Sequence, residues 1–158
     1  MEDTTLEIET REAAEQFLAA VPPIWYSLRA QIDKIARQKF AITGGQYQVL
    51  RRIKSGMNSI SKLAEARHIS LPTVSRKVEH LVEKGLVARR ESQQDRRCMI
   101  LELTEAGEEI IQEMEFSRQK WLEEQFCVLD DHDLETIIHA LSLMSALSQK
   151  GSVGKQNG

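Results

Sequence analysis

The sequence predicts a mainly α-helical protein that carries one small β-hairpin. Apolar residues recur at three- and four-residue spacings along most of the 158 residues, as in amphipathic helices. Residues 86–103 differ, because two short runs of β-forming residues flank the polar, turn-like stretch SQQDRR. Four arginines fall within positions 89–97 of this hairpin, although the whole chain has a net charge of -3.

The first 40 residues are expected to form two helices. Thr10 is a candidate N-cap for the first helix, and the Pro22-Pro23 pair should interrupt it. A second helix restarts at Ile24 with one apolar stripe. The Gly44-Gly45 pair marks the next boundary, and the short helix that follows it should end at Gly56.

Two short helices come next in the chain. Ser61 is the expected N-cap of the first, KLAEARH, in which Leu63 and Ala64 should face inward. Ser70 is the expected N-cap of the second, and Pro72 falls in its first turn, where a missing N–H is harmless. This second helix has apolar residues at Val74, Val78, Leu81 and Val82 and should stop at Gly85.

Two helices joined by a short turn form a helix-turn-helix, whose second helix enters the DNA major groove. A helix-turn-helix followed at once by a charged hairpin is a winged helix. Arg96 and Arg97 should lie at the wing tip, where the narrow minor groove concentrates negative potential. Asp95 should hold a neighbouring arginine by a charge-assisted hydrogen bond. The alternative is a solvated hairpin with ordinary surface arginines.

The residue pattern of the C-terminal third predicts two more helices. Thr104 should cap a long one, and Asp130 should start the last one, with Asp133 three residues on. Their apolar faces exceed what one small winged domain can cover, so a second copy of the chain should bury them; the alternative is a compact monomer. These faces are formed by Ile110, Met114, Trp121 and Phe126, and by Leu134, Ile137, Ile138, Leu141 and Met144.

Charge is distributed unevenly. Residues 62–97 contain nine Lys or Arg and five Asp or Glu, a local charge of +4, so the rest of the chain carries -7. This asymmetry indicates one face made for an anionic partner and another that stays away from it.

The stretch LVEKGLVARRESQQDRRCMILELTEAG, residues 81–107, resembles the MarR family of winged-helix transcriptional regulators. The matching positions are a Leu-x-x-x-Gly-Leu-Val-x-Arg segment, an Asp-x-Arg wing and a closing Leu-Thr-x-x-Gly. One departure is visible, because Ser92 and Gln93 stand where many members have an acid-proline pair. The resemblance implies a homodimer that binds a pseudo-palindromic DNA operator, most simply as a repressor. The matching residues are Leu81, Gly85, Leu86, Val87, Arg89, Asp95, Arg97, Leu103, Thr104 and Gly107.

We therefore predict a winged helix-turn-helix with N- and C-terminal dimerisation helices. Residues 1–40 and 104–148 form the dimerisation helices, residues 41–103 form the DNA-binding lobe, and residues 149–158 form a disordered tail. Arg76 is the candidate for reading guanine, while Lys62 and Lys77 should contact phosphates. The predicted DNA-binding residues are Lys62, Ser70, Pro72, Thr73, Ser75, Arg76, Lys77, Arg89, Asp95, Arg96 and Arg97.

A ligand site is also expected. The resemblance suggests release from DNA by a small aromatic or phenolic ligand, since many members of the family respond to such compounds. Trp25, Tyr26 and Arg29 lie together near the start of the second predicted helix, and Tyr47 and Arg51 lie on the next one. Aromatic faces and cations could thus converge on one cleft. The alternative is that Trp25 and Tyr47 are core residues.

The sequence offers no enzyme motif. The four histidines, at 68, 80, 132 and 139, have no metal-ligand spacing with the cysteines, and no Gly-rich phosphate loop is present, so no cofactor or metal is predicted. Cys98 and Cys127 are expected to be packing residues, with a redox-responsive regulator as the alternative. A winged-helix module that binds proteins rather than DNA is the other alternative. We expect a cytoplasmic protein, since no signal peptide or span of about 20 apolar residues is present.

Overall fold

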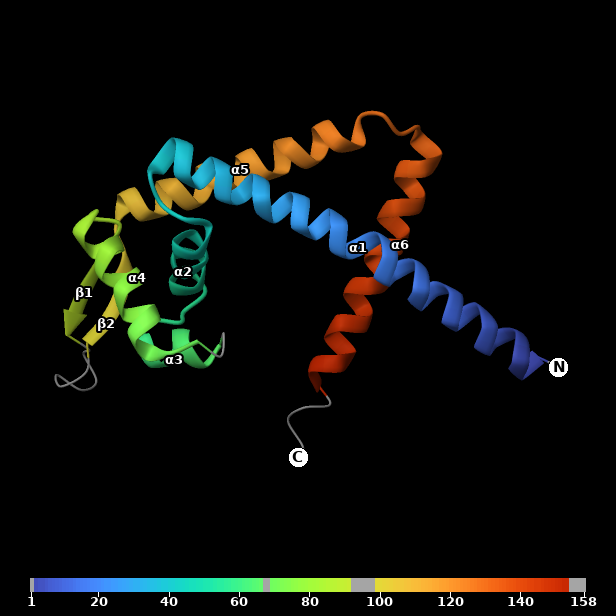
Figure 1. The fold of residues 1–158 in the computed structure, drawn as a ribbon, viewed down its shortest axis with the longest axis horizontal. Helices are drawn as coiled ribbons and strands as arrows, with labels where there is room; N and C mark the ends of the chain where they lie inside the picture. Colours follow the sequence, from blue (N-terminus) through green and yellow to red (C-terminus); the bar gives the residue numbers. More distant parts are fainter. Residues whose placement is uncertain (1, 67–68, 92–98, 154–158) are drawn as a thin grey trace. The chain divides into compact units, whose positions relative to one another are not determined.

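The computed structural model describes residues 2–66, 69–91 and 99–153 of the chain. The predicted fold class is confirmed, because the described residues are mainly helical with one antiparallel hairpin. The chain forms two compact units, Met1–Arg118 and Gln119–Gly158. The elements are α1 (Glu2–Phe40), α2 (Gly44–Lys54), α3 (Ile60–Glu65), α4 (Leu71–Glu83), β1 (Val87–Glu91), β2 (Met99–Leu103), α5 (Glu105–Phe126) and α6 (Asp131–Val153) (Figure 1).

The N-terminal segment is one continuous helix, α1, and not two. The predicted start at Thr10 and the predicted break at Pro22-Pro23 are both wrong. The prolines remove the donors for the carbonyls of Leu18 and Ala19, but these two residues are exposed, so water can hydrate the freed oxygens.

The end of α1 is closed by Ala41, which adopts a positive φ of 51°. Its N–H donates to the Arg37 carbonyl, and the N–H of Ile42 donates to the Ala36 carbonyl, both at 3.2 Å. The bond from Ala41 to Arg37 is that of the αL motif, in which glycine is the usual residue at the left-handed position. The motif turns the chain so that Ile42 enters the core with 1% of its surface exposed.

Helix α2 begins with a capping box that the sequence reading missed. The Thr43 side chain accepts a hydrogen bond from the Gln46 N–H at 3.2 Å, and the Gln46 side chain accepts one from the Thr43 N–H at 2.7 Å. The predicted boundary at Gly44-Gly45 is therefore confirmed, but the capping box of Thr43 and Gln46, rather than the glycine pair, starts the helix. The predicted stop is also confirmed, since α2 ends at Lys54 and Gly56 has a φ of 92°.

Helix α3 starts two residues earlier than predicted. Ser59, not Ser61, is the N-cap, and its hydroxyl accepts a hydrogen bond from the Lys62 N–H at 3.3 Å. Either serine satisfies the local rule, but capping at Ser59 brings Ile60 against the core together with Leu63 and Ala64. The inward orientation of Leu63 and Ala64 is confirmed.

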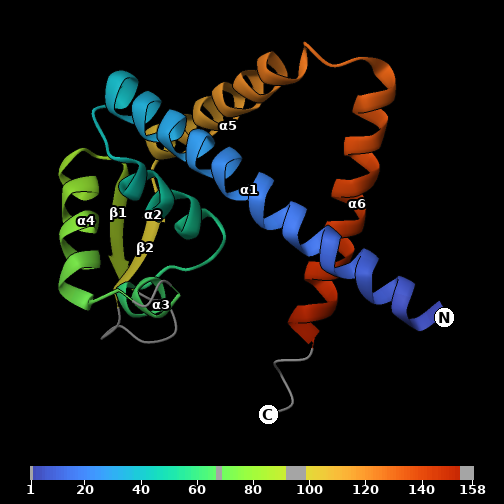
Figure 2. The ribbon, with the colours of Figure 1, turned by 45° about the vertical axis from the view of Figure 1, so that its right-hand side comes forward.

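The helix-turn-helix and the hairpin are confirmed. Ser70 is the N-cap of α4, Pro72 lies in its first turn, and Gly85 follows its end with a φ of 68°. Strands β1 and β2 pair antiparallel, with Val87 opposite Leu103 and Glu91 opposite Met99. Figure 2 shows α2, α3, α4 and the hairpin gathered into one lobe. Their shared core contains Tyr47, Leu50, Leu63, Val74, Val78, Leu81, Val87 and Leu101.

Helix α5 starts as predicted after Thr104, whose hydroxyl accepts a hydrogen bond from the Gly107 N–H at 3.1 Å. Its first half joins the core through Met114 and through Ile111, which the predicted apolar face omitted. Helix α6 is capped as predicted, because the Asp133 N–H donates to the Asp130 side chain at 2.9 Å. It extends to Val153, so the predicted disordered tail from residue 149 overlaps its last turn. Among the described residues, no helix is long and apolar enough to cross a membrane.

Candidate nucleic-acid interface and adjacent cleft

The first turn of α4 is shaped by a hydroxyl pair. Ser70 has the extended backbone of an N-cap but makes no side-chain cap bond. Instead the hydroxyls of Ser70 and Thr73 lie 2.8 Å apart and share a hydrogen bond. Ser70, Leu71 and Pro72 are exposed, so this turn presents a preorganised surface at the end of the helix that a winged helix inserts into the major groove.

The body of α4 is divided into a buried and an exposed face. Val74, Val78 and Leu81 have at most 1% of their surface exposed. Arg76 is exposed on the other face and makes no ion pair with any described residue. Ser75 donates to Glu79 at 3.2 Å, which partly engages a hydroxyl that we expected to approach DNA.

The two predicted phosphate contacts differ in environment. Lys62 of α3 is exposed. Lys77 is only half exposed, and its side chain runs toward the start of α2. A Cβ at Gly45 would lie 3.2 Å from the Lys77 Nζ, so the ammonium would have to shift by a few tenths of an ångström to admit one. Gly45 thus leaves room for this cation beside the start of α2.

The base of the wing carries cations that face solvent. Arg89 is exposed and makes no ion pair with any residue in the described ranges, whereas Arg90 pairs with Glu102 on β2 at 2.8 Å. Among the described residues, Arg89 is therefore the cation of this strand that has no ion pair. The predicted tip residues Asp95, Arg96 and Arg97 lie outside the described residues, as do His68 and Cys98.

A cluster of hydrogen bonds joins the recognition helix, the wing and α5. The Thr104 hydroxyl donates to the Gly85 carbonyl at 2.7 Å, and the Thr104 N–H donates to the Leu86 carbonyl at 3.2 Å. A Cβ at Gly107 would overlap that same Leu86 carbonyl. The Gly-Leu and Leu-Thr-x-x-Gly segments noted in the sequence are therefore structural: they hold the wing against the end of α4.

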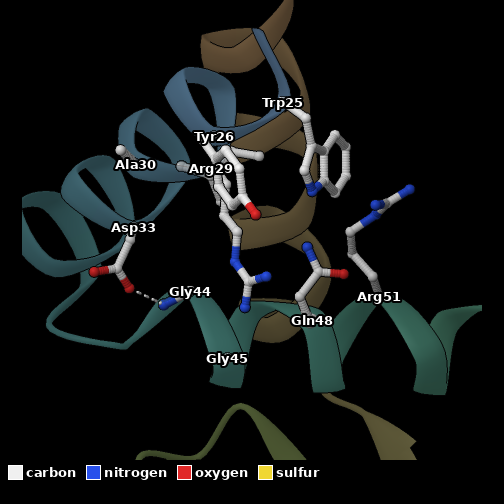
Figure 3. Close-up of a pocket in the computed structure, with 10 residues that line it drawn as sticks. Trp25, Tyr26, Arg29, Ala30, Asp33, Gly44, Gly45, Gln48 and Arg51 are labelled. Atoms are coloured by element: carbon white, nitrogen blue, oxygen red, sulfur yellow. Dashed lines mark hydrogen bonds between the residues drawn. The ribbon is translucent and has the colours of Figure 1, made fainter. Parts of the chain in front are cut away.

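A cleft of about 490 Å³ lies between α1 and α2. Figure 3 shows Trp25, Tyr26 and Arg29 extending from α1 toward α2, from which Gln48 and Arg51 extend in return. Four of the five predicted ligand residues thus line one cleft. The complete lining is Trp25, Tyr26, Arg29, Ala30, Ile32, Asp33, Gly44, Gly45, Gln48 and Arg51.

Tyr47, the fifth predicted ligand residue, is placed elsewhere. Its ring lies in the core with none of its surface exposed, and its hydroxyl has no hydrogen-bond partner among the described residues. Burial raises the pKa of this hydroxyl, although the Arg118 and Arg51 charges oppose the shift. The alternative that Tyr47 is a core residue is therefore the correct one.

Asp33 closes one end of the cleft, and the sequence reading missed it. Its carboxylate accepts hydrogen bonds from the Gly44 N–H and from Arg37 Nε, both at 2.7 Å. These bonds, the Gly44 one first, hold the pKa of Asp33 below its ordinary value. The carboxylate charge is thus already engaged. Arg29 and Arg51 make no ion pair with any described residue, so the cleft has two available cations beside exposed aromatic rings.

Apolar side chains are exposed along the terminal helices. On α1 they include Phe17, Leu18 and Ile24, which are at least 46% exposed. On α6, in the second compact unit, they include Ile138, Leu141 and Leu143, which are at least 50% exposed. Cys127 is exposed as well, and its thiol donates to the Glu124 carbonyl at 3.1 Å, so the expectation that it packs in the interior is wrong.

Comparison with known proteins identifies the lobe. The MarR family model matches residues 42–99, which run from two residues before α2 to the first residue of β2. The match places this lobe in the MarR family. Members are transcriptional regulators, so the expectation of a winged-helix regulator rather than an enzyme agrees with the family and the fold.

One sequence relative of this MarR-family chain is the Bacillus subtilis protein described as the uncharacterized HTH-type transcriptional regulator YhbI. The two are 35% identical over 88 residues, which are 55% of this chain and 57% of that protein. The matched part therefore spans less than two thirds of the relative.

Solved structures match more of the chain. Transcriptional regulator Tm0710 from Thermotoga maritima is 24% identical, with a TM-score of 0.77 over 90% of this chain and 99% of that one. A MarR transcriptional regulator from Methanosarcina mazei is 27% identical, with a TM-score of 0.64 over 86% and 98%. FabT of Streptococcus pneumoniae, solved in complex with DNA, is 17% identical, with a TM-score of 0.67 over 87% and 98%.

Proposed function

We propose that this MarR-family protein is a cytoplasmic, homodimeric repressor that binds a pseudo-palindromic operator and is released by a small aromatic anion. The observation that carries the DNA-binding part is the exposed face of α4, where the free Arg76 guanidinium stands on a helix whose opposite face is buried. A guanidinium in the major groove can make two hydrogen bonds to guanine. The DNA complex of the structurally similar FabT supports the same use of the fold.

The apolar surfaces of the terminal helices support the homodimer part of the proposal. Exposed apolar side chains such as Phe17 on α1 and Ile138 on α6 are hydrated at a cost in free energy. A second copy of the chain offers them an identical apolar surface, and pairing removes both surfaces from water. A dimer also places two recognition helices on one duplex. Their separation should be about 34 Å or a small multiple, one turn of DNA.

Selection from random DNA tests this function. We expect an inverted repeat to emerge, and we expect light scattering of the complex to give two protein chains per duplex. Selection of a single half-site, or a monomer on DNA, would contradict the homodimeric regulator. A protein-interaction module would bind DNA weakly and without sequence preference, so comparing the selected duplex with a shuffled one across a salt series separates the two functions.

The effector part of the proposal rests on the cleft between α1 and α2. Trp25 and Tyr26 offer aromatic faces, and Arg29 and Arg51 offer charge for a carboxylate or phenolate. A ligand that separates α1 from α2 would also change where α4 lies, since α2 and α4 share one core. Coupling of about 1 to 3 kcal/mol would lower DNA affinity roughly 5- to 150-fold.

Titration with salicylate, with and without operator DNA, tests the effector. We expect salicylate to bind free protein more tightly than the DNA complex, and Arg29→Gln together with Arg51→Gln to remove that binding. Lys34→Gln is a matched control, because Lys34 is an exposed cation of α1 that does not line the cleft. Equal affinity in both states would exclude release by this ligand.

A further inference from the structure

Leu71, the first residue of α4, is an exposed apolar residue in an unusual place. It is 52% exposed, whereas Val74 and Val78 of the same helix have at most 1% of their surface exposed. Positions 71, 74 and 78 fall on one helical stripe. Leu71 therefore lies on the same helix face as the buried residues but beyond the end of the core. About half of its surface is exposed at the N-terminus of the recognition helix.

Two features next to Leu71 reduce the hydrogen-bonding capacity of the first turn, although the Ser70–Thr73 pair leaves one hydroxyl proton unused. Pro72 is exposed and has no N–H. The hydroxyls of Ser70 and Thr73 already bond to each other at 2.8 Å. An apolar surface of two adjacent residues is thus presented at the tip of the helix, framed by an engaged hydroxyl pair.

In the major groove, the apolar feature of the base edges is the C5-methyl group of thymine. The N-terminal residues of a recognition helix are those that approach base edges. A leucine side chain cannot bond to phosphates or to polar base edges, but it can bury a methyl group. We propose that Leu71 is a specificity-determining residue that packs against a thymine methyl in each operator half-site. This inference rests on the proposed DNA-binding function.

The position of Arg76 adds a prediction about the operator. Leu71 and Arg76 are five residues apart, which is about 7.5 Å along the helix and about 140° around it, so the two side chains should contact different base pairs. Each half-site should therefore contain a thymine read by Leu71 and, at a separate base pair, a guanine read by Arg76.

Replacement of single thymines by deoxyuridine, which lacks the methyl group, tests this directly. In the selected operator, one thymine per half-site should be sensitive, and its replacement should weaken wild-type binding about 4-fold, or about 15-fold when both half-sites are changed. Leu71→Ala should bind more weakly than wild type and should not distinguish thymine from deoxyuridine at that position. Arg76→Ala, a matched change on the same helix, should bind weakly but keep the sensitivity.

The outcomes separate the inference from the function on which it rests. If an operator is selected but no deoxyuridine matters, or if Leu71→Ala stays as sensitive as wild type, the role of Leu71 is wrong and the DNA-binding function stands. If no sequence is selected at all, both are wrong. Should Leu71→Ala melt too early to assay, Leu71→Val should show a reduced deoxyuridine effect, and the wild-type scan needs no variant.

Discussion

Asp33 of α1 and Gly44 of α2 are joined by a hydrogen bond of 2.7 Å, in which the Gly44 N–H donates to the carboxylate. A Cβ at Gly44 would lie 3.0 Å from that carboxylate oxygen, so glycine permits the close approach. The adjacent Gly45 makes the same kind of room for Lys77 of α4. Gly44 and Gly45 therefore contact α1 and the recognition helix α4, and both of them line the cleft.

Asp33→Ala should destabilise the protein by about 0.5 to 1 kcal/mol at pH 7, because it removes a partly solvent-screened acceptor from the start of α2. The pKa of Asp33 is lowered in the folded protein, so its contribution is complete above the ordinary carboxyl range and is lost as pH falls through the lowered value. Thermal unfolding of wild type and variant from pH 7 to pH 3 should converge toward the acid end. A constant difference would show that the charge of Asp33 is irrelevant to the bond.

Gly107→Ala should cost about 1 to 3 kcal/mol or prevent folding, because the added methyl overlaps the Leu86 carbonyl and must push the wing away from α5. Chemical unfolding at a fixed protein concentration measures the loss. Ala106→Ser, an exposed change in the same turn, should stay within about 0.5 kcal/mol of wild type. Equal stability of the two variants would refute the close approach.

Tyr47→Phe should stabilise the protein by about 1 kcal/mol, because it deletes a buried hydroxyl that has no partner among the described residues. The raised pKa of Tyr47 means that the neutral phenol is favoured, so wild type should lose stability as pH rises past about 10 while the variant loses less. Urea unfolding checks both points. Tyr26→Phe is the control, since Tyr26 is 68% exposed and its hydroxyl can be hydrated in either state.

Ala41→Gly should stabilise the protein by about 0.5 to 1 kcal/mol, because alanine is strained at a φ of 51° and glycine is not. The melting temperature should rise. Ala19→Gly, within the same helix, should change it in the opposite direction by a similar amount. A lower melting temperature for Ala41→Gly would mean that unfolded-state entropy outweighs the relieved strain.

Asp95→Ala should weaken operator binding even though it removes a negative charge, because we predict that Asp95 orients an arginine of the wing. Arg97→Ala should weaken it by about 1 to 3 kcal/mol. Glu91→Ala is the contrast: Glu91 is exposed at the end of β1, and its removal should strengthen binding through charge alone. Quantitative gel shifts measure all three, and tighter binding by Asp95→Ala would show that simple charge counting suffices.

Features set by neighbouring residues were predictable from the sequence. Ser70, Pro72 and Gly85 act through local hydrogen bonds and backbone angles, so the limits of the recognition helix follow from the residues themselves. The runs of β-forming residues on either side of the polar stretch SQQDRR likewise predicted the hairpin. The four cleft residues Trp25, Tyr26, Arg29 and Arg51 were placed together because each lies on a helical face with a known period.

Other features were decided only by tertiary structure. The choice of Ser59 over Ser61 depends on whether Ile60 can reach the core, and the continuity of α1 through Pro22 depends on water reaching the freed carbonyls. Tyr47 and Leu71 both have the periodicity of core residues, yet one is fully buried and the other overhangs the end of its helix. Periodicity determines which face of a helix a residue occupies, but burial depends on how far the packed neighbours extend, and that distance is a property of the assembled fold.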